Sequence, residues 1–218
     1  MKFEGIIFDL DGTMANTLED LSDSMNRVLA EKCFPTHSYE LYKTIIGKGL
    51  RNLVTSSLPE INRTNETIDE CYNLMMEDYS NNCLNKTHLY KGFAEVIEKL
   101  KQQGIKLAVL SNKIDDLTQR IVDHLADAKN FDVILGAQPD VPPKPDPKGA
   151  LLIAKRMGIA PENILYIGDT GIDMLTANKA GMKAIGAAWG FRTKKELHDN
   201  GAMVILNLPV ELLRITSK

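Results

Sequence analysis

The stretch Phe3-Glu4-Gly5-Ile6-Ile7-Phe8-Asp9-Leu10-Asp11-Gly12-Thr13 decides the fold. Its apolar run, from Ile6 to Phe8, is typical of a strand that is buried on both faces inside a parallel sheet. Two aspartates separated by one residue follow this strand at once. Side chains at the carboxyl end of such a strand point into the crevice where open α/β sheets bind ligands. We therefore expect Asp9 and Asp11 to belong to a ligand site.

The two aspartates have two interpretations. Neighbouring carboxylates repel each other unless a cation lies between them, and hard divalent cations such as Mg²⁺ prefer oxygen ligands. A metal site is therefore one interpretation of Asp9 and Asp11. The other is an ordinary polar turn, in which Asp11-Gly12 supplies only the turn conformation. The rest of the chain decides between them.

The composition is that of an ordinary globular protein. The 218 residues are 44% hydrophobic and 25% charged, and this length allows one core domain with a smaller insert. The net charge of -3 gives no general attraction to nucleic acid or anionic membranes, so any phosphate recognition must be local. No apolar stretch approaches the length of a membrane span, and no signal-peptide pattern is present. We expect a cytoplasmic protein without nucleic-acid or membrane partners, as a monomer or homodimer.

The cysteines and histidines do not indicate a metal site or a disulfide framework. The three cysteines, Cys33, Cys71 and Cys83, are odd in number and have no C-x-x-C spacing. We expect them to be reduced and partly buried thiols. The four histidines are scattered along the chain, and we expect surface or local structural roles for them.

From the first strand to about His88 the sequence pattern is helical. Apolar residues recur at helical spacing from Leu18 to Leu29, and Thr17 with Asp20 resembles an N-terminal capping arrangement. Glycine, proline and polar stretches separate further segments of helical pattern. We expect these helices at 38–46, 50–58 and 67–83. Residues 16–88 are therefore predicted to form an all-helical insert, large enough for a small bundle.

From Tyr90 onward helices and strands alternate strictly. The expected strands are 106–110, 132–135, 164–167, 183–187 and, at an edge, 202–206. The expected helices are 92–102, 115–125, one from the proline-rich loop to 157, one through 180 and one from 209. Such alternation indicates right-handed βαβ units and a parallel sheet with helices on both faces. We expect an α/β, Rossmann-like core domain formed by residues 1–15 and 89–218.

Polar residues follow several of these strands. Ser111 follows the second strand, Lys144 lies in the loop after the third, and Asp169 and Asp173 follow the fourth. Each has a purely structural explanation: Ser111 as a helix N-cap, Lys144 as a solvated lysine, and Asp173 as a first-turn acid beside the N-cap Thr170. Because the carboxyl ends of parallel strands meet at one edge, their joint occurrence favours a common site.

The order of these residues is coherent with phosphoryl transfer. Asp9 is the candidate nucleophile, which attacks phosphorus to form an aspartyl-phosphate, and Asp11 is the candidate general acid and base. Ser111 would donate a hydrogen bond to a phosphoryl oxygen. Lys144 would balance the charge of the transition state and keep Asp9 ionised. The candidate Mg²⁺ ligands are Asp9, Asp11, Asp169 and Asp173.

Two further groups of residues are candidates for substrate binding. Backbone amides around Gly12, Thr13 and Asn112 would hold the remaining phosphoryl oxygens. The connection Gly47-Lys48-Gly49, with Arg51 after it, allows close backbone approach, and Lys48 or Arg51 would meet a second anionic group of the substrate. A plain helix connection with solvated charges is the alternative. The stretch is not a P-loop, because a tyrosine stands where the leading glycine should be.

The chain resembles the haloacid dehalogenase superfamily of phosphohydrolases, and within it the phosphoglycolate-phosphatase-like branch. Four motifs carry the resemblance: Asp9-Leu10-Asp11-Gly12-Thr13, Leu110-Ser111-Asn112-Lys113, Lys144-Pro145-Asp146-Pro147 and Gly168-Asp169-Thr170-Gly171-Ile172-Asp173. It covers essentially the whole chain, because the helical insert matches the family's cap and Ala188-Trp189-Gly190-Phe191 is similar to a turn of the branch. The resemblance implies a Mg²⁺-dependent phosphomonoesterase with a mobile cap hinged near residues 15–17 and 88–92.

The resemblance also defines competing activities. Asp11 argues against dehalogenation, because the dehalogenases lack the second aspartate of motif one. Phosphonate-cleaving relatives use a cap lysine, for which Lys43 and Lys48 are available. Sugar phosphomutases share every core motif found here, and pyrophosphatases belong to the same superfamily. Asn16 stands where the family often has an aspartate, at a position that helps to shape the hinge into the cap.

Two other classes of protein fit less well. A non-catalytic phosphate-binding module would be expected to lack Asp9 or Asp11, and both are present. An NAD-binding protein would carry a G-x-G-x-x-G turn after the first strand, where this chain has Asp-Gly-Thr. We therefore expect hydrolysis of a small acidic phosphate ester, with phosphoglycolate first and pyrophosphate or a nucleotide monophosphate after it.

Overall fold

A computed structural model describes residues 3–216, and their contacts divide the chain into two compact units. One unit comprises the described residues up to Asn16 and from Leu89 onward, and the other comprises Thr17–His88. The short strands β2 (Ala15–Asn16) and β3 (His88–Leu89) pair with each other where the chain passes between the units. Among the described residues, no helix has the length and apolarity needed to cross a membrane.

The first unit is built on a six-stranded parallel sheet. Its strand order is β5-β4-β1-β6-β7-β8, so the first strand of the sequence lies between β4 and β6 in the middle of the sheet. Phe8 at the end of β1 is paired with Val109 on one side and Ile167 on the other. The strands are β1 (Gly5–Phe8), β4 (Lys106–Ile114), β5 (Val133–Ala137), β6 (Ile164–Gly168), β7 (Lys183–Ala187) and β8 (Val204–Leu206).

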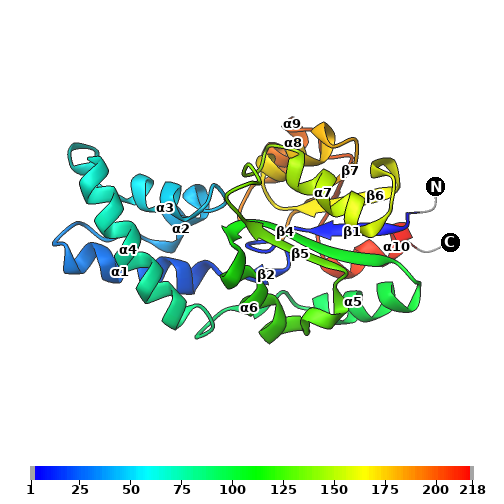
Figure 1. The fold of residues 1–218 in the computed structure, drawn as a ribbon, viewed down its shortest axis with the longest axis horizontal. Helices are drawn as coiled ribbons and strands as arrows, with labels where there is room; N and C mark the ends of the chain where they lie inside the picture. The colour runs from blue at the N-terminus through cyan, green and yellow to red at the C-terminus, as the bar shows by residue number, and fades with distance from the viewer. Residues whose placement is uncertain (1–2, 217–218) are drawn as a thin grey trace. The chain divides into compact units, whose positions relative to one another are not determined.

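Helices cover both faces of this sheet (Figure 1). One face carries α5 (Phe93–Gln102), α6 (Asp115–Ala126) and α10 (Leu212–Thr216), and the other carries α7 (Lys148–Met157), α8 (Gly171–Lys179) and α9 (Lys194–Asp199). The short 3₁₀ turns are η2 (Ala128–Asn130), η3 (Pro161–Asn163) and η4 (Pro209–Glu211).

The central strand β1 is buried on both faces. The ring of Phe8 packs edge-on against Phe93 of α5, with 5.1 Å between the ring centroids. Ile7 joins the core on the opposite face, together with Ile153 of α7 and Tyr166 of β6. The α/β fold with a parallel sheet, predicted from the apolar run and the alternation of elements, is confirmed.

Strand β4 differs from its predicted form. It continues to Ile114 instead of ending at Leu110, and its register with β5 shifts on the way. Leu110 is paired with Leu135 and Ile114 with Ala137, so three residues of β4 stand opposite the single Gly136. A Cβ atom at Gly136 would lie 2.4 Å from the Cα of Asp115. Only glycine, which has no Cβ, avoids this clash. Such bulges redirect side chains beside functional sites.

The second unit is helical, and its helices begin within a few residues of the predicted positions. They are α1 (Leu18–Glu31), α2 (Tyr39–Ile45), α3 (Leu50–Ser57) and α4 (Asn65–Asn82), with the 3₁₀ turn η1 (Glu60–Asn62). Ser38 and Thr64 cap α2 and α4 by accepting backbone N–H groups of the first turn. α1 and α3 both pack against α4, and buried Met25, Val54 and Met75 fill the core.

The capping arrangement predicted for α1 is wrong. Thr17 is the N-cap residue, but its side chain makes no capping hydrogen bond. The carboxylate of Asp20 instead accepts hydrogen bonds from the backbone N–H groups of Lys86, at 2.9 Å, and Thr87, at 2.8 Å. Asp20 therefore ties the first turn of α1 to the segment that follows α4. Its sequence neighbourhood gave no sign of a partner 66 residues away.

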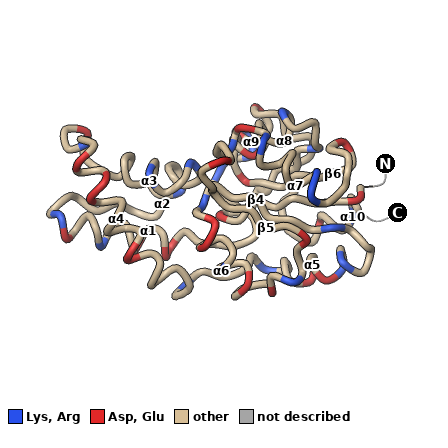
Figure 2. The backbone as a smooth tube through the Cα atoms, in the orientation of Figure 1, with Lys and Arg blue, Asp and Glu red and all other residues tan. Residues whose placement is uncertain are grey.

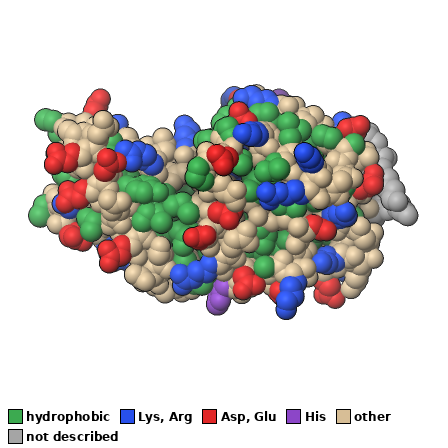
Figure 3. Space-filling view, in the orientation of Figure 1, with side chains coloured by type: hydrophobic (Ala, Val, Ile, Leu, Met, Phe, Trp, Pro, Cys, Tyr) green, Lys and Arg blue, Asp and Glu red, His purple; other side chains and the backbone are tan. Residues whose placement is uncertain are grey.

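Charged side chains of both signs are interspersed on the two units. Figure 2 shows acidic and basic residues following each other along the helices of each unit. On the face drawn in Figure 3, small groups of either sign are separated by hydrophobic and uncharged side chains. Among the described residues on this face, positive charge is not gathered into one stripe.

Candidate active site

The carboxyl ends of β1, β4 and β6 bring the predicted polar residues together. Asp9 directly follows β1, and its backbone N–H donates to the carbonyl oxygen of Ile167, which keeps it in register with β6. Lys144 arrives from the loop after β5, and its Nζ lies 2.8 Å from Oδ1 of Asp9. The same Nζ lies 2.7 Å from Oδ1 of Asp173 in the first turn of α8. Lys144 is therefore a bridge between two carboxylates and not a solvated lysine.

Three carboxylates form a buried acidic cluster. Asp9, Asp169 and Asp173 each place an oxygen within 4.8 Å of the others, and at most 5% of any of these residues is exposed. Burial and the charges of Asp173 and Asp169 raise the pKa of Asp9 well above its ordinary value, whereas Lys144 opposes this rise. Burial and Asp173 raise the pKa of Asp169 to about 7, against hydrogen bonds from Phe191 and Thr13 that lower it.

The chemistry of this cluster fits a divalent metal ion. Three carboxylates around one ammonium group leave an excess of negative charge in a buried place. Carboxylate oxygens are the ligands that Mg²⁺ prefers, and a cation among them would offset both the burial and the mutual repulsion that raise the pKa of Asp9 and Asp169. Asp9, Asp169 and Asp173 are therefore the residues able to hold it.

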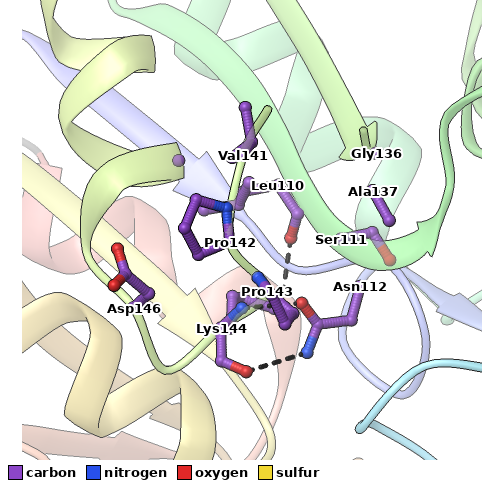
Figure 4. A pocket seen from close by; sticks show the side chains of 11 residues that line it. Leu110, Ser111, Asn112, Gly136, Ala137, Val141, Pro142, Pro143, Lys144 and Asp146 are labelled. Atoms are coloured by element: carbon purple, nitrogen blue, oxygen red, sulfur yellow. Dashed lines mark hydrogen bonds between the residues drawn. The ribbon is translucent and has the colours of Figure 1, made fainter. Parts of the chain in front are cut away.

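Lys144 is fixed at its backbone as well as at its ammonium group. Its N–H donates to Oδ1 of Asn112 at 2.8 Å, and Nδ2 of Asn112 donates to its carbonyl oxygen at 3.1 Å (Figure 4). Its Nζ also donates to the carbonyl oxygen of Leu110 at 3.3 Å. Burial disfavours the charge of Lys144, but Asp173 and Asp9 outweigh it and raise the pKa of this lysine well above its ordinary value.

Ser111 and Asn112 lie in the bulge of β4. Oγ of Ser111 accepts a hydrogen bond from the N–H of Lys113 at 3.1 Å. It is not the N-cap of α6, because Ile114 holds that position. Figure 4 shows Ser111 and Asn112 beside Lys144 at a small pocket of the first unit, which is also lined by other residues of the loop that carries Lys144. The side chain of Asn112, a predicted substrate-binding residue, is engaged with the backbone of Lys144.

Asp169 is held by residues from two other segments. Oγ1 of Thr13 donates to its Oδ1 at 2.9 Å, and the N–H of Phe191 donates to its Oδ2 at 2.7 Å. The indole N–H of Trp189 in turn donates to the carbonyl oxygen of Thr13 at 2.8 Å. The turn after β7 therefore supports the site, and the hydroxyl of Thr13, a predicted substrate-binding residue, is directed at Asp169.

Two glycines allow this close approach around Asp169. Gly12 has a φ of +85°, and a Cβ on it would lie 2.3 Å from Oδ2 of Asp169. A Cβ on Gly190 would lie 2.2 Å from Cβ of Asp169 and 2.3 Å from the carbonyl oxygen of Gly12. Real Cβ atoms do not approach this closely. Glycine is therefore required in motif one and in the turn after β7.

Asp173 belongs both to the acidic cluster and to the start of a helix. Its Oδ2 accepts hydrogen bonds from the N–H of Thr170, at 3.1 Å, and from its Oγ1, at 2.6 Å. Together with the N–H of Asp173 that Thr170 accepts, these bonds form a capping box for α8. The N-cap predicted at Thr170 is confirmed, and the same carboxylate holds Lys144.

Asp11 lies outside the acidic cluster of Asp9, Asp169 and Asp173. Its Oδ1 is 3.1 Å from Nζ of Lys113, and 12% and 5% of the two side chains are exposed. The structure therefore brings together three of the four carboxylates predicted to bind metal and pairs the fourth with a lysine. Lys113 was not among the predicted site residues. Its place directly after the Ser-Asn pair of motif two was the available signal.

The remaining candidates, Gly47, Lys48 and Arg51, lie in the helical unit. Gly47 has a φ of +116° and precedes Lys48 in the connection between α2 and α3. Nη1 of Arg51 lies 2.6 Å from Oδ1 of Asp69 on α4, with both side chains more than half exposed. Arg51 thus has an acidic partner within its own unit, which the sequence did not reveal.

Comparison with known proteins decides the family. Residues 6–187 match the family model described as haloacid dehalogenase-like hydrolase. The chain belongs to this family. The match includes all four motifs that meet at the strand ends, from Asp9 to Asp173. The family predicted from those motifs is confirmed, and the protein is a hydrolase.

Relatives of this haloacid dehalogenase-like hydrolase align along nearly its whole length. It is 33% identical to the phosphoglycolate phosphatase of Mannheimia succiniciproducens, with 98% of each chain covered. It is 32% identical to that of Aquifex aeolicus, with 85% of each chain covered. A solved structure from Haemophilus somnus, described as a predicted phosphoglycolate phosphatase, is 29% identical with a TM-score of 0.91 and covers 100% of this chain and 99% of its own.

Proposed function

We propose that this hydrolase is a Mg²⁺-dependent phosphomonoesterase that acts on a small phosphorylated metabolite through an aspartyl-phosphate on Asp9. One observation carries the proposal: Lys144 bridges Asp9 and Asp173 inside a buried cluster of three carboxylates. A nucleophilic carboxylate paired with a fixed cation, beside a cluster suited to a hard metal, is the equipment that phosphoryl transfer needs. The relatives named as phosphoglycolate phosphatases make phosphoglycolate the first substrate to test.

In the first step Asp9 attacks phosphorus. A bond forms between its carboxylate oxygen and phosphorus, and the bond from phosphorus to the ester oxygen breaks. Asp11 donates a proton to the departing oxygen, which leaves as an alcohol. Lys144 keeps Asp9 ionised and balances charge on the phosphoryl oxygens. Ser111 and the backbone amides of Gly12, Thr13 and Asn112 would bind these oxygens.

In the second step water attacks the aspartyl-phosphate. Asp11 removes a proton from this water, the bond between phosphorus and Asp9 breaks, and inorganic phosphate leaves. Mg²⁺ held by Asp9, Asp169 and Asp173 would neutralise phosphate charge and allow the anionic ester to approach an anionic nucleophile. The carboxylate of Asp11 is assigned to proton transfer, because it pairs with Lys113 outside the acidic cluster.

We further propose that residues 16–88 form a cap domain for the core of residues 1–15 and 89–218. In this proposal the cap selects the substrate. Lys48, with the open backbone at Gly47, and Arg51 are its candidate contacts for a second anionic group such as the carboxylate of phosphoglycolate. Lys48 is preferred over Arg51, because Arg51 already has Asp69 as a partner.

The proposal is tested by phosphate release from a panel of small phosphate esters, with Mg²⁺ and with EDTA. Wild-type protein should release phosphate only with the metal, most rapidly from phosphoglycolate. Asp9→Asn keeps the shape of the side chain but removes the nucleophile, so turnover should be lost while the circular dichroism spectrum is unchanged. Asp116→Asn, on the exposed side of α6, is the matched control and should retain full activity.

Other outcomes have definite meanings. Absence of phosphate release from every ester, by wild-type protein that is folded and saturated with Mg²⁺, would contradict the phosphatase proposal. Transfer of phosphate between positions of a sugar, followed by ³¹P NMR, would then identify a phosphomutase. Activity that survives Asp9→Asn would exclude an aspartyl-phosphate on this residue.

A further inference from the structure

The ion pair of Lys113 with Asp11 is a second lysine–carboxylate contact at the edge of the sheet, separate from the one made by Lys144. The Nζ–Oδ1 distance is 3.1 Å, and the lysine side chain is 5% exposed. A lysine is rarely buried to this extent unless its charge is paired. In the proposed reaction Lys144 pairs with the nucleophile Asp9, and Lys113 has no role.

The two partners are set in place by different parts of the backbone. Asp11 lies in a tight loop, in which the N–H of Gly12 donates to the carbonyl oxygen of Ala15 and the N–H of Ala15 donates to that of Leu10. Lys113 lies in the bulge of β4, where its N–H donates to Oγ of Ser111. Two rigid backbone positions thus converge on one side-chain contact. The bulge is what turns a buried lysine of β4 toward Asp11.

We propose that Lys113 is a positioning residue, which holds the Asp11 carboxylate where it exchanges a proton with the leaving-group oxygen. This inference rests on the proposed function, in which Asp11 is the general acid and base. Proton transfer requires the carboxyl group within hydrogen-bond reach of the ester oxygen. An aspartate side chain rotates about two bonds, and a buried ammonium fixed to one of its oxygens removes that freedom. Each lysine thus has its own carboxylate: Lys144 pairs with the nucleophile Asp9, and Lys113 pairs with the proton donor Asp11.

Two other roles for Lys113 make different predictions. A lysine that contacts the phosphoryl group would assist every ester to a similar extent. A lysine with only a structural role would affect stability and leave the relative rates of different esters unchanged. In the first step, a lysine that acts through Asp11 matters only where the leaving group needs a proton. An alkoxide needs one, whereas the stable nitrophenolate anion leaves without it.

The experiment compares kcat/KM for phosphoglycolate and for p-nitrophenyl phosphate in the wild type and in Lys113→Met, because kcat/KM reports only the steps up to departure of the leaving group. We expect kcat/KM for the alkyl ester to fall by about 100-fold and kcat/KM for the nitrophenyl ester by less than about 3-fold. Lys113→Arg keeps the charge but moves it, and should give a smaller loss that is again confined to the alkyl ester. Equal losses on both esters, or no loss on either, would overturn the inference.

A double variant separates action through Asp11 from direct action. In an Asp11→Asn background, Lys113→Met should cause no further loss on phosphoglycolate, because residues that act as one unit are not additive. This double variant removes both charges of the ion pair together, so it remains informative if Lys113→Met alone fails to fold. A further loss as large as in the wild-type background would contradict the inference.

Lys106→Met is the matched control. Lys106 begins the same strand at its opposite end, and its Nζ donates to the carbonyl oxygen of Met157 at 2.7 Å. This variant should leave both rates unchanged. A folded wild type, saturated with Mg²⁺, that releases phosphate from no ester of the panel contradicts the proposed function, and with it the role of Asp11. An active wild type with equal losses in Lys113→Met overturns the inference on Lys113 alone.

Discussion

At the scale of single residues, the site consists of side chains that hold other side chains. Asp169 accepts one hydrogen bond from Thr13 and one from the backbone of Phe191, and Trp189 holds Thr13 in turn. Lys144 depends in the same way on Asn112. Residues that support a metal ligand in this manner tune metal affinity even though they do not touch the metal.

Replacing Thr13 by valine should weaken Mg²⁺ binding. Valine keeps the volume of threonine but removes the hydroxyl that orients Asp169, so we expect the dissociation constant for Mg²⁺ to rise about 10-fold, measured by isothermal titration calorimetry. Thr176→Val is the matched control, because this buried threonine donates only to the carbonyl oxygen of Ile172 inside α8. Unchanged affinity in Thr13→Val, or an equal loss in the control, would contradict the prediction.

Much of the site at this scale was predictable from strand ends, and its supporting contacts were not. Asp9, Lys144, Asp169 and Asp173 meet where parallel strands end, as their positions in the sequence predicted. Their chemical roles stay predictions. The pairing of Lys113 with Asp11 and of Thr13 with Asp169 joins segments more than 100 residues apart, and no local pattern encodes such pairs.

At the scale of elements, the turn after β7 is a structural part of the site. We expect Gly190→Ala to destabilise the protein by at least about 2 kcal/mol, because its Cβ would meet the backbone of Gly12 and the Cβ of Asp169. Urea unfolding followed by circular dichroism measures this. Gly149→Ala, in α7, is the control: its Cβ would meet side-chain ends and no backbone, namely Leu110 at 3.0 Å and Val141 at 3.5 Å, so we expect a change within about 1 kcal/mol. Similar effects of the two substitutions would contradict this account.

The connection between α2 and α3 gives a second prediction at this scale. We expect Lys48→Ala to raise KM for phosphoglycolate by about 10-fold, because it removes the contact with the second anionic group. KM for an alkyl phosphate whose alkyl group carries no charge should stay unchanged. Arg51→Ala should change KM less than Lys48→Ala, since Arg51 is paired with Asp69. It should change the free energy of unfolding by less than about 1 kcal/mol, because this ion pair is exposed.

Asp69→Ala is the control for the arginine. If it alters stability as Arg51→Ala does and leaves KM unchanged, the ion pair is structural. If KM for both esters keeps its wild-type value in all three variants, Lys48 and Arg51 do not contact the substrate as proposed.

Elements with strong periodicity were predictable, and short or irregular ones were not. The helices of residues 17–88 begin near their predicted positions because apolar spacing marks them. The caps Ser38 and Thr64 were not predicted, and α4 begins at Asn65 instead of residue 67. Helix α9 has six residues with only Leu197 buried, so its periodicity is too short to recognise. The bulge of β4 was missed because it is a shift of register against β5, and the sequence of β4 alone does not show how it pairs with another strand.

At the scale of the whole molecule, the acidic cluster links metal binding to stability. The pKa of Asp169 rises from an ordinary value of about 4 to about 7 on folding, so the folded state favours the protonated form. This contribution to the free energy of unfolding is complete below about pH 4 and is lost as the pH rises toward 7. Mg²⁺ binds the deprotonated carboxylates, so its stabilising effect should grow over the same range.

Urea unfolding with EDTA and with saturating Mg²⁺, at pH 5, 6, 7 and 8, tests this. The difference between the two conditions should increase by a few kcal/mol toward pH 7 and then level off. Titration of groups distant from the metal changes the free energy of unfolding equally in both conditions, so its effect cancels in this difference. Asp169→Asn removes one of the two cluster carboxyl groups whose pKa is raised, the other being Asp9, and should reduce the dependence on pH. A difference that is constant with pH in the wild type would contradict the prediction.

The fold class could be predicted from the sequence, but the order of the strands in the sheet could not. Alternating helices and strands predicted a parallel sheet with helices on both faces, and the buried run 6–8 predicted an interior strand. The order β5-β4-β1-β6-β7-β8 was not predicted, because a pattern along the chain does not state which strands become neighbours. That order determines which of the strand-end residues meet.

The central position of β1 has a consequence for how the protein is synthesised. The strand ends at Phe8, but its neighbours in the sheet begin at Lys106 and Ile164. At roughly 5–20 residues per second, β1 leaves the ribosome many seconds before either partner exists. The helices of residues 17–88, which contact one another within that segment, are complete in the meantime. The nascent chain therefore carries all residues of the helical unit, together with an apolar strand that still lacks its partners. Asp9 at the end of that strand pairs with Lys144 only after residue 144 has been made.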